Sequence, residues 1–350
     1  MSADYDRPVD SMISATRAWF SRLIPVVLLS ISASADEAIP GVDIGGLLFG
    51  DAYYNPSNHL ESGDGALGLV LRRGYLTFDG KIPANTFWRI RFELNQSGEF
   101  ETYDFEVDFK DLYVGWNLGR QQLLLGLSPT PTFDVIESQW GLRYLMRTAV
   151  DLQGGPSREN GISVKGPINE SGTLSYRAMI GTRIDFGNET DERARYMAAL
   201  TWKPAPDWTL DFYVDRQSQP GPTDVTSGQV YVSRITEAWR WGLQYSHADR
   251  ETNPPLKLAS AWAVKPVGER TSLVGRIDRV FEPSPRGNNI AYIPFDPSAP
   301  ATLYLLAYEY QATPDFTLTP NVVVVNYDRN DEGVRPTTDV YLRLTAYFTF

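Results

Sequence analysis

Residues 341–350 read YLRLTAYFTF and end on Phe350. Counting back by twos from Phe350 gives only apolar side chains as far as Val340, whereas the intervening set is Tyr and Thr with one charge, Arg343. Successive side chains of a β-strand point to opposite faces. The stretch therefore predicts a β-strand with one apolar and one polar face, about as long as a strand that crosses a bilayer at a tilt.

The same alternation recurs along the chain from Gly41 onward. Trp88, Ile90 and Phe92 alternate with polar residues, as do Tyr196 and Trp202 further on. Short connections rich in Pro, Gly, Asn or Asp alternate with long ones, which is the rhythm of an antiparallel barrel. We expect sixteen strands, at 41–55, 67–80, 85–96, 107–117, 120–127, 159–168, 172–184, 193–203, 207–217, 228–235, 238–248, 257–265, 269–281, 301–312, 315–328 and 337–350.

Two of these strands are ambiguous. Residues 322–325 are all Val and are apolar on both faces, and the strand at 301–312 fits either register. If the polar face of the other strands lines the interior, the even-numbered residues of the last strand, which include Phe350, point outward. Arg343 then points inward.

The composition narrows the class of protein. The 350 residues contain no cysteine, which excludes disulfides, thiolate metal sites and cysteine nucleophiles. After residue 31 no apolar run approaches the 18 residues that suggest a spanning helix. A membrane form of this chain would therefore be a closed barrel, since only helices and closed barrels satisfy all backbone groups in lipid.

The first 35 residues have the pattern of a secretory signal peptide. Arg17 and Arg22 precede an apolar run, and Ala33 and Ala35 form a small-residue cleavage site. Three acids before Met12 are unusual for such a segment, so we expect translation to start at Met12. We assign residues 1–35 to the signal peptide and 36–350 to the barrel. The formal net charge of −11 argues against a nucleic-acid partner.

Little in the sequence suggests catalysis. The two histidines are His59, in the first long connection, and His247, whose neighbour Ser246 points to the opposite face of its strand. No phosphate loop, metal-ligand spacing or dinucleotide fingerprint is present. We expect no enzyme activity, no catalytic residue, no metal and no cofactor.

Arginine accounts for 26 of the 32 basic residues. Nine of these arginines fall on the polar faces and are expected to line the interior: Arg73, Arg89, Arg91, Arg177, Arg183, Arg195, Arg240, Arg276 and Arg343. Two interpretations stay open. The arginines favour anions in a water-filled pore, or they pair with acids on the same faces. The candidate acids are Glu93, Asp211, Asp215, Asp278 and Glu309.

The longest connection, residues 128–158, differs from the others. Its centre carries apolar residues that include Ile136 and Trp140, and an unstructured loop of this length would be unusual. If it is helical there, Arg143 and Arg147 lie four apart and share a face. We hypothesise that the loop folds inward and that these two arginines face the solute at a constriction. The alternative is an extracellular loop that packs on its neighbours.

Several motifs between Leu67 and Ile168 resemble, in their order, the phosphate-selective porin family (porins O and P). They are Arg72 and Arg73 opening a strand, FELNQ at 92–96, FKDLYVGW at 109–116, GLSPTP at 126–131, YLMRT at 144–148 and RENGISVKG at 158–166. The terminal aromatic strand also resembles the last strand of bacterial outer-membrane barrels, where it is the assembly signal.

The resemblance implies a sixteen-stranded transmembrane β-barrel, a homotrimer, and a third loop folded inward with Arg143 and Arg147 near the constriction. Phosphate-selective channels are rich in interior lysines and arginines, whereas this chain has six lysines in all. Phosphate preference therefore stays open.

We expect a passive diffusion channel for small hydrophilic or anionic solutes, embedded in the lipid of a Gram-negative outer membrane. The alternatives are an outer-membrane barrel enzyme and a soluble secreted β-sandwich. The sequence leaves open the natural solute, the sign of ion selectivity and the oligomeric state.

Overall fold

The computed structural model describes residues 41–82, 85–96, 105–182, 194–218, 224–251 and 253–350. The expected signal peptide, with Met12, lies outside the described residues, and so does Arg183. Among the described residues, no helix has the length and apolar character that crossing a membrane requires.

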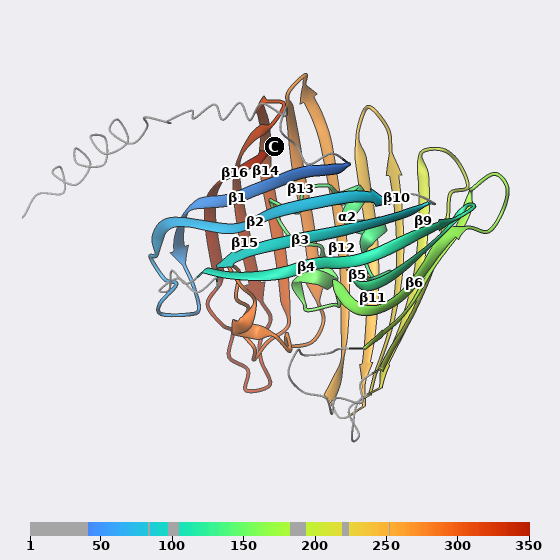
Figure 1. Ribbon diagram of the computed structural model, residues 1–350. Coiled ribbons are helices and arrows are strands. Elements are labelled where there is room, and N and C mark those ends of the chain that lie inside the picture. The colour runs from blue at the N-terminus through green and yellow to red at the C-terminus, as the bar shows by residue number, and fades with distance from the viewer. Residues whose placement is uncertain (1–40, 83–84, 97–104, 183–193, 219–223, 252) are drawn as a thin grey trace, which may run out of the picture. The chain divides into compact units, whose positions relative to one another are not determined.

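Sixteen strands form one closed barrel, in which every strand is antiparallel to both neighbours and β1 pairs with β16 (Figure 1). The strands are β1 (Val42–Ser57), β2 (Leu67–Ile82), β3 (Thr86–Gln96), β4 (Phe105–Leu118), β5 (Gln121–Pro129), β6 (Arg158–Pro167), β7 (Leu174–Thr182), β8 (Ala194–Trp202), β9 (Trp208–Ser218), β10 (Val225–Ile235), β11 (Arg240–Arg250), β12 (Asn253–Gly268), β13 (Thr271–Val280), β14 (Ala301–Thr313), β15 (Phe316–Tyr327) and β16 (Asp339–Thr349).

The predicted all-β barrel of sixteen strands is thus confirmed, and the alternative of a β-sandwich is wrong because the strands make a single closed sheet. The largest disagreement at a strand start is in β12, which was expected from residue 257 and begins at Asn253. Closure leaves no free sheet edge, so each strand has hydrogen-bonding partners on both sides.

The two faces of the closing strand are as its alternation predicts. Leu342, Leu344 and Phe348 are exposed, whereas Arg343 and Thr345 are buried. We call the face with the exposed apolar side chains the outer face and the opposite one the inner face. The same parity holds in β8, where Tyr196, Leu200 and Trp202 are exposed.

Two of the β-bulges bring an extra basic residue to the inner face. In β2 the pairing steps from Phe49–Arg73 to Gly50–Leu71, so Arg72 is an extra residue. In β4 it steps from Arg91–Asp111 to Phe92–Phe109, so Lys110 is extra. A bulge re-aims the side chains around it, and here it lets Arg72 join Arg73, and Lys110 join Asp111, on the inner face.

Two long connections carry helical turns. Residues 130–157 contain α2 (Asp134–Trp140) and α3 (Ala149–Leu152), and the connection between β13 and β14 contains the 3-10 turn η2 (Gly287–Asn289). Gly141 adopts φ 66° and ends α2 in the left-handed conformation that favours glycine. In this region α2 contacts β10 and α3 contacts β12.

The largest hydrophobic core joins these connections to the inner face of β12–β16. It includes Trp140 and Leu145 from the first connection, Phe295 from the second, and Leu303 and Val323 from the strands. This core resolves the two ambiguous strands. In β14, Leu303 and Leu305 face inward and Leu306 faces outward, and in β15 Val323 and Val325 face inward.

Candidate functional site

The inner face carries arginines that are paired with acids. In β3, Arg89 lies 2.7 Å from Asp79, and Arg91 lies 3.3 Å from Asp111. One strand away, Arg73 contacts Glu93.

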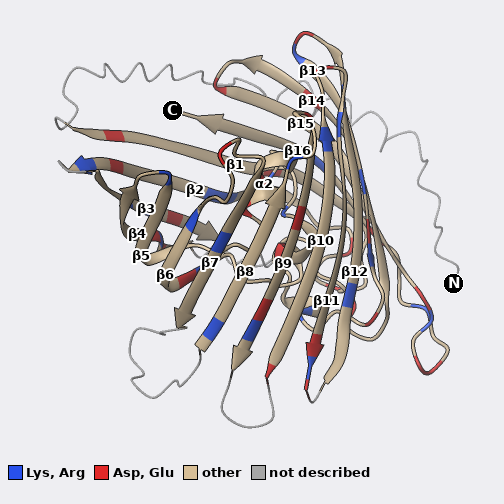
Figure 2. Cartoon of the chain, turned by 90° about the vertical axis from the view of Figure 1, so that its right-hand side faces the viewer, with Lys and Arg blue, Asp and Glu red and all other residues tan. Residues whose placement is uncertain are grey.

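The same arrangement continues around the barrel. Arg177 lies 2.8 Å from Asp211, and Arg276 lies 2.6 Å from Asp278. Figure 2 shows basic and acidic positions interspersed along β7–β12. Three pairs are longer: Arg195 is 3.6 Å from Glu159 and 3.8 Å from Asp215, and Arg343 is 4.0 Å from Asp51.

Seven of the eight described arginines that were expected on the inner face therefore have a carboxylate within 4 Å. Four of the five candidate acids are partners in these pairs, and the fifth, Glu309, accepts a hydrogen bond from the Tyr144 hydroxyl. Arg240 differs: it donates to the backbone oxygen of Gln139 at 3.0 Å, and no described carboxylate forms an ion pair with it.

Two of the inner-face bases that were missing from the expected set lie at the bulges. Arg72 lies 2.9 Å from Asp51, and Lys110 lies 2.8 Å from Glu93. Both are the extra residues of the bulges, so a strict period of two places them on the wrong face. The adjacent pair Arg72–Arg73 and the adjacent pair Lys110–Asp111 were the only sequence signals for them.

Residues 130–157 are fastened to several strands. Arg72 of β2 donates to the backbone oxygens of Tyr144 and Leu145, and Arg276 of β13 donates to the backbone oxygen of Arg147 at 2.6 Å. Gln139 donates to Thr209 Oγ1 of β9 at 2.9 Å. Partners in β2, β9 and β13 hold the loop from several sides.

Arg143 and Arg147 would share a face if this stretch were helical, and it is not, because α2 stops at Trp140 and α3 starts at Ala149. The two arginines also differ in their surroundings. Arg143 lies 3.0 Å from Glu137 and contacts Asp151. Arg147 forms no ion pair within the described chain, and its Nη2 atom is buried there without a hydrogen-bond partner.

The electrostatics of the loop follow these contacts. Burial lowers the pKa of Arg147 to about 10, and the charges of Arg73, Arg143 and Arg286 also lower it. The charge of Asp151 acts in the opposite direction and raises it. Burial would raise the pKa of Asp151, but Arg143 and Arg147 outweigh it and hold that pKa at about 2. Arg143, with its two acids, is neutralised; Arg147 is a cation in a mostly positive neighbourhood.

The described residues contain no group of His, Asp and Glu side chains that could hold a metal ion. His59 contacts Asp339 and Asn288. Ser246 is buried on the inner face of β11, whereas its neighbour Tyr245 is exposed on the outer face. Among the described residues, no hydrogen bond joins either histidine to a serine hydroxyl.

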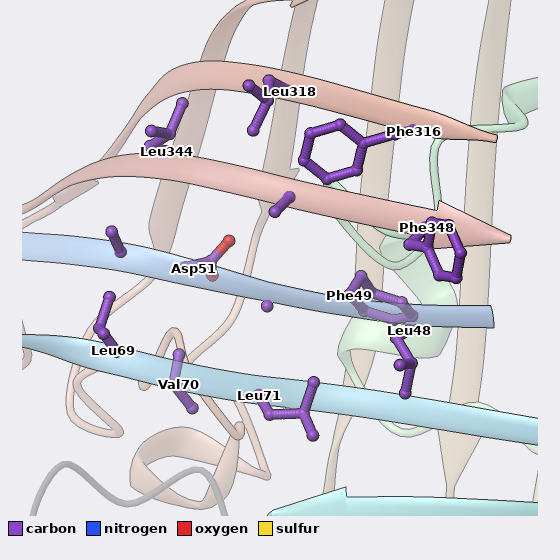
Figure 3. Close-up of a pocket in the computed structure, with 13 residues that line it drawn as sticks. Leu48, Phe49, Asp51, Leu69, Val70, Leu71, Phe316, Leu318, Leu344 and Phe348 are labelled. Atoms are coloured by element: carbon purple, nitrogen blue, oxygen red, sulfur yellow. The ribbon is translucent and has the colours of Figure 1, made fainter. Parts of the chain in front are cut away.

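An apolar hollow lies on the outer face, and Asp51 is the charged residue in its lining (Figure 3). Leu69 of β2, Leu48 of β1, Leu344 and Phe348 of β16, and Leu318 of β15 surround it. Its floor includes the small residues Gly50, Ala52 and Ala346.

No protein-family model and no curated protein matches this sequence. Solved structures do resemble this protein. An anion-selective porin from Comamonas acidovorans is 14% identical with a TM-score of 0.61, and the match covers 88% of this chain and 99% of that one. The outer-membrane channel DcaP of Acinetobacter baumannii is 12% identical with a TM-score of 0.61, covering 88% and 97%.

The trimer form of OmpT, an outer-membrane protein of Vibrio cholerae, is 13% identical with a TM-score of 0.57, covering 88% and 99%. At these identities the likeness concerns the fold. This chain therefore has the barrel fold of outer-membrane porins and channels, over nearly the whole length of each structure compared.

Proposed function

We propose that this protein is a porin of a Gram-negative outer membrane, a passive water-filled channel for small hydrophilic solutes and ions. The observation that carries the proposal is the opposite character of the two faces of one closed barrel. The outer face exposes large apolar side chains, as lipid requires, and the inner face carries ion-paired charges. The porin-like solved structures support the same class.

Residues 130–157 are proposed to fold inward and form the constriction. Support comes from their partners, since Arg72, Thr209 and Arg276 all extend from the inner face. Tyr144 supports the same position, because its ring stacks on Tyr347 of β16 at 4.4 Å between centroids.

A preference for anions is the finer part of the proposal. Paired arginines contribute little net field, because a carboxylate within 4 Å cancels most of the charge at a distance. The preference therefore depends on cations that form no ion pair among the described residues, such as Arg147 at the constriction and Arg240 beside it. A preference for phosphate is a narrower form of this proposal, in which Arg147 donates to phosphate oxygens.

We also propose a homotrimer surrounded by outer-membrane lipid. The apolar hollow over β15, β16, β1 and β2 suits contact with another copy, because its small-residue floor permits close approach of side chains. The trimer form of the structurally similar OmpT supports this oligomeric state.

The test is the zero-current potential of the purified protein in a planar bilayer under a KCl gradient. The proposal expects discrete channels and a potential of anion-selective sign. The absence of channels would overturn the porin, and a cation-selective sign would overturn only the anion preference. Phosphate added at constant chloride should reduce the chloride current if phosphate binds at Arg147, and should leave it unchanged otherwise.

The variant Arg147→Gln should shift the potential toward cation selectivity, because it removes the unpaired cation and leaves the pair of Arg143 with Asp151. Arg329→Gln is the matched control, since Arg329 is exposed between β15 and β16 and donates to Gly333 O. Equal shifts of the potential in both variants would contradict the position of Arg147 at the constriction.

A further inference from the structure

The connection between β13 and β14 is far longer than the hairpin needs. Val280 and Ala301 are direct partners across the two strands, yet residues 281–300 lie between them. A hairpin closes with two to about five residues, and long connections in compact folds are usually functional. The extra length therefore calls for a role other than joining the strands.

This connection reaches strands on another side of the barrel. The Tyr292 hydroxyl lies 3.0 Å from the backbone oxygen of Arg72 and 2.8 Å from that of Gln96. These partners belong to β2 and β3, which lie four and five strand positions around the ring from β14. A segment that starts at β13 and bonds to the inner-face bulge of β2 therefore crosses from one side of the barrel to another.

Further contacts hold the segment along its course. Arg343 of β16 donates to the backbone oxygen of Tyr292 at 2.5 Å, and the backbone N–H of Asp296 donates to the Tyr327 hydroxyl of β15 at 3.0 Å. Ile290, Ile293 and Phe295 are 1–2% exposed. Burying three large apolar side chains stabilises this position of the segment.

The segment also meets the proposed constriction loop. Ser284 donates to Gln153 Oε1 at 2.6 Å, and Ile290, Tyr292 and Phe295 share one hydrophobic core with Trp140 and Leu145. Arg286 lies against Gly154, where an added Cβ would stand 2.7 Å from Arg286 Cδ. Arg286 is itself exposed, so its guanidinium reaches water beside the constriction loop.

We propose that residues 281–300 form a second pore-narrowing loop, anchored across the interior by Tyr292, and that Arg286 is the charge it presents to the solute. The inference rests on the proposed channel function and deepens it. The permeating solute passes between two loops rather than between one loop and the wall. A small anion then meets Arg147 from one loop and Arg286 from the other.

The main test replaces residues 282–299 with a four-residue Gly/Asn turn, which β13 and β14 can accept because Val280 and Ala301 already pair. Single-channel conductance should rise at least about twofold, because the narrowest section sets the resistance of a pore. Unchanged conductance in a folded variant would overturn the inference. Absence of channels in the unaltered protein would instead overturn the proposed function.

A second variant guards against misfolding of the first. Tyr292→Phe keeps the ring and removes the hydroxyl that bonds to the oxygens of Arg72 and Gln96, so the open-channel current should become noisier. Tyr304→Phe is the matched control, because Tyr304 is exposed on the outer face of β14. Equal current noise in the two variants would contradict the anchor.

Arg286→Gln tests the charge. It should shift the zero-current potential toward cation selectivity in the direction expected for Arg147→Gln, whereas Arg329→Gln should not. A zero-current potential equal to that of the unaltered protein would show that Arg286 does not lie on the solute path.

Discussion

The inner faces of β3–β9 and of β12–β16 differ sharply, although they belong to one barrel. The first carries ion pairs such as Arg89–Asp79 and Arg177–Asp211. Much of the second is apolar, with Leu303, Leu305 and Val323 at most 1% exposed. The difference arises because residues 130–157 and 281–300 cover the second region with their own apolar side chains.

This contrast shows that the inside of a barrel is not uniformly wet. Where water or paired charge fills the interior, strands alternate between polar and apolar residues. Where loops cover the wall, both faces of a strand are apolar and the alternation fades. The ambiguous strands, β14 and β15, are among those under the loops.

The largest predicted effect lies in the charged region. Arg177→Met should destabilise the barrel by about 3–5 kcal/mol, because it leaves the 1%-exposed Asp211 buried without its partner. The midpoint and slope of urea unfolding in detergent micelles measure it. The double variant Arg177→Met with Asp211→Leu should recover most of the loss; no recovery would mean that the pair is not what holds this part of the wall.

The next effect lies in the apolar region. Leu303→Ala should cost about 2–5 kcal/mol, since it leaves a cavity in the core beneath the loops. Leu306→Ala, on the outer face of the same strand and 65% exposed, is the control and should cost less. The same urea titration compares them, and an equal loss would indicate that the loops do not pack on this wall.

The smallest effect concerns the attachment of the second loop to residues 58–66. His59 Nδ1 lies 2.8 Å from Asp339 Oδ2, and its Nε2 lies 2.9 Å from Asn288 Oδ1. Both partners are acceptors, so the imidazolium satisfies both. Burial lowers the pKa of His59, but the bonds to Asp339 and Asn288 and the charges of Asp339 and Asp296 raise it by more.

Since the folded pKa of His59 is raised, its contribution is fully present below the ordinary histidine pKa near 6.5 and is lost as pH rises through the folded value. The facing groups are Asp339 of β16, Asp296 and Asn288 of the second loop, and Tyr327 of β15. NMR titration should place the pKa of His59 above 6.5, with the other histidine, His247, resolved in the same spectrum. An unshifted His59, or a shift that survives Asn288→Ala and Asp339→Asn together, would contradict this attachment.

The sequence predicted the strands well because a period of two is a local property. All sixteen strands were found, and the parity of Phe350 correctly oriented Arg343. The pattern failed locally at Arg72 and Lys110, where a bulge shifts the parity, and at Arg143 and Arg147, where Gly141 ends the helix. Arg286 and Tyr292 gave no signal, because their importance depends on contacts with residues far along the chain.

The sequence by itself determined the closed barrel, because alternating strands with apolar outer faces bury their backbone groups in lipid only when the sheet has no edge. Only the tertiary structure decided which charges are free. Ion pairing depends on which strands become neighbours and on where two loops pack, and those are distances that no linear pattern contains. That is why Arg143 and Arg147, equivalent in the sequence, differ in the fold: one pairs with two acids, and the other has none.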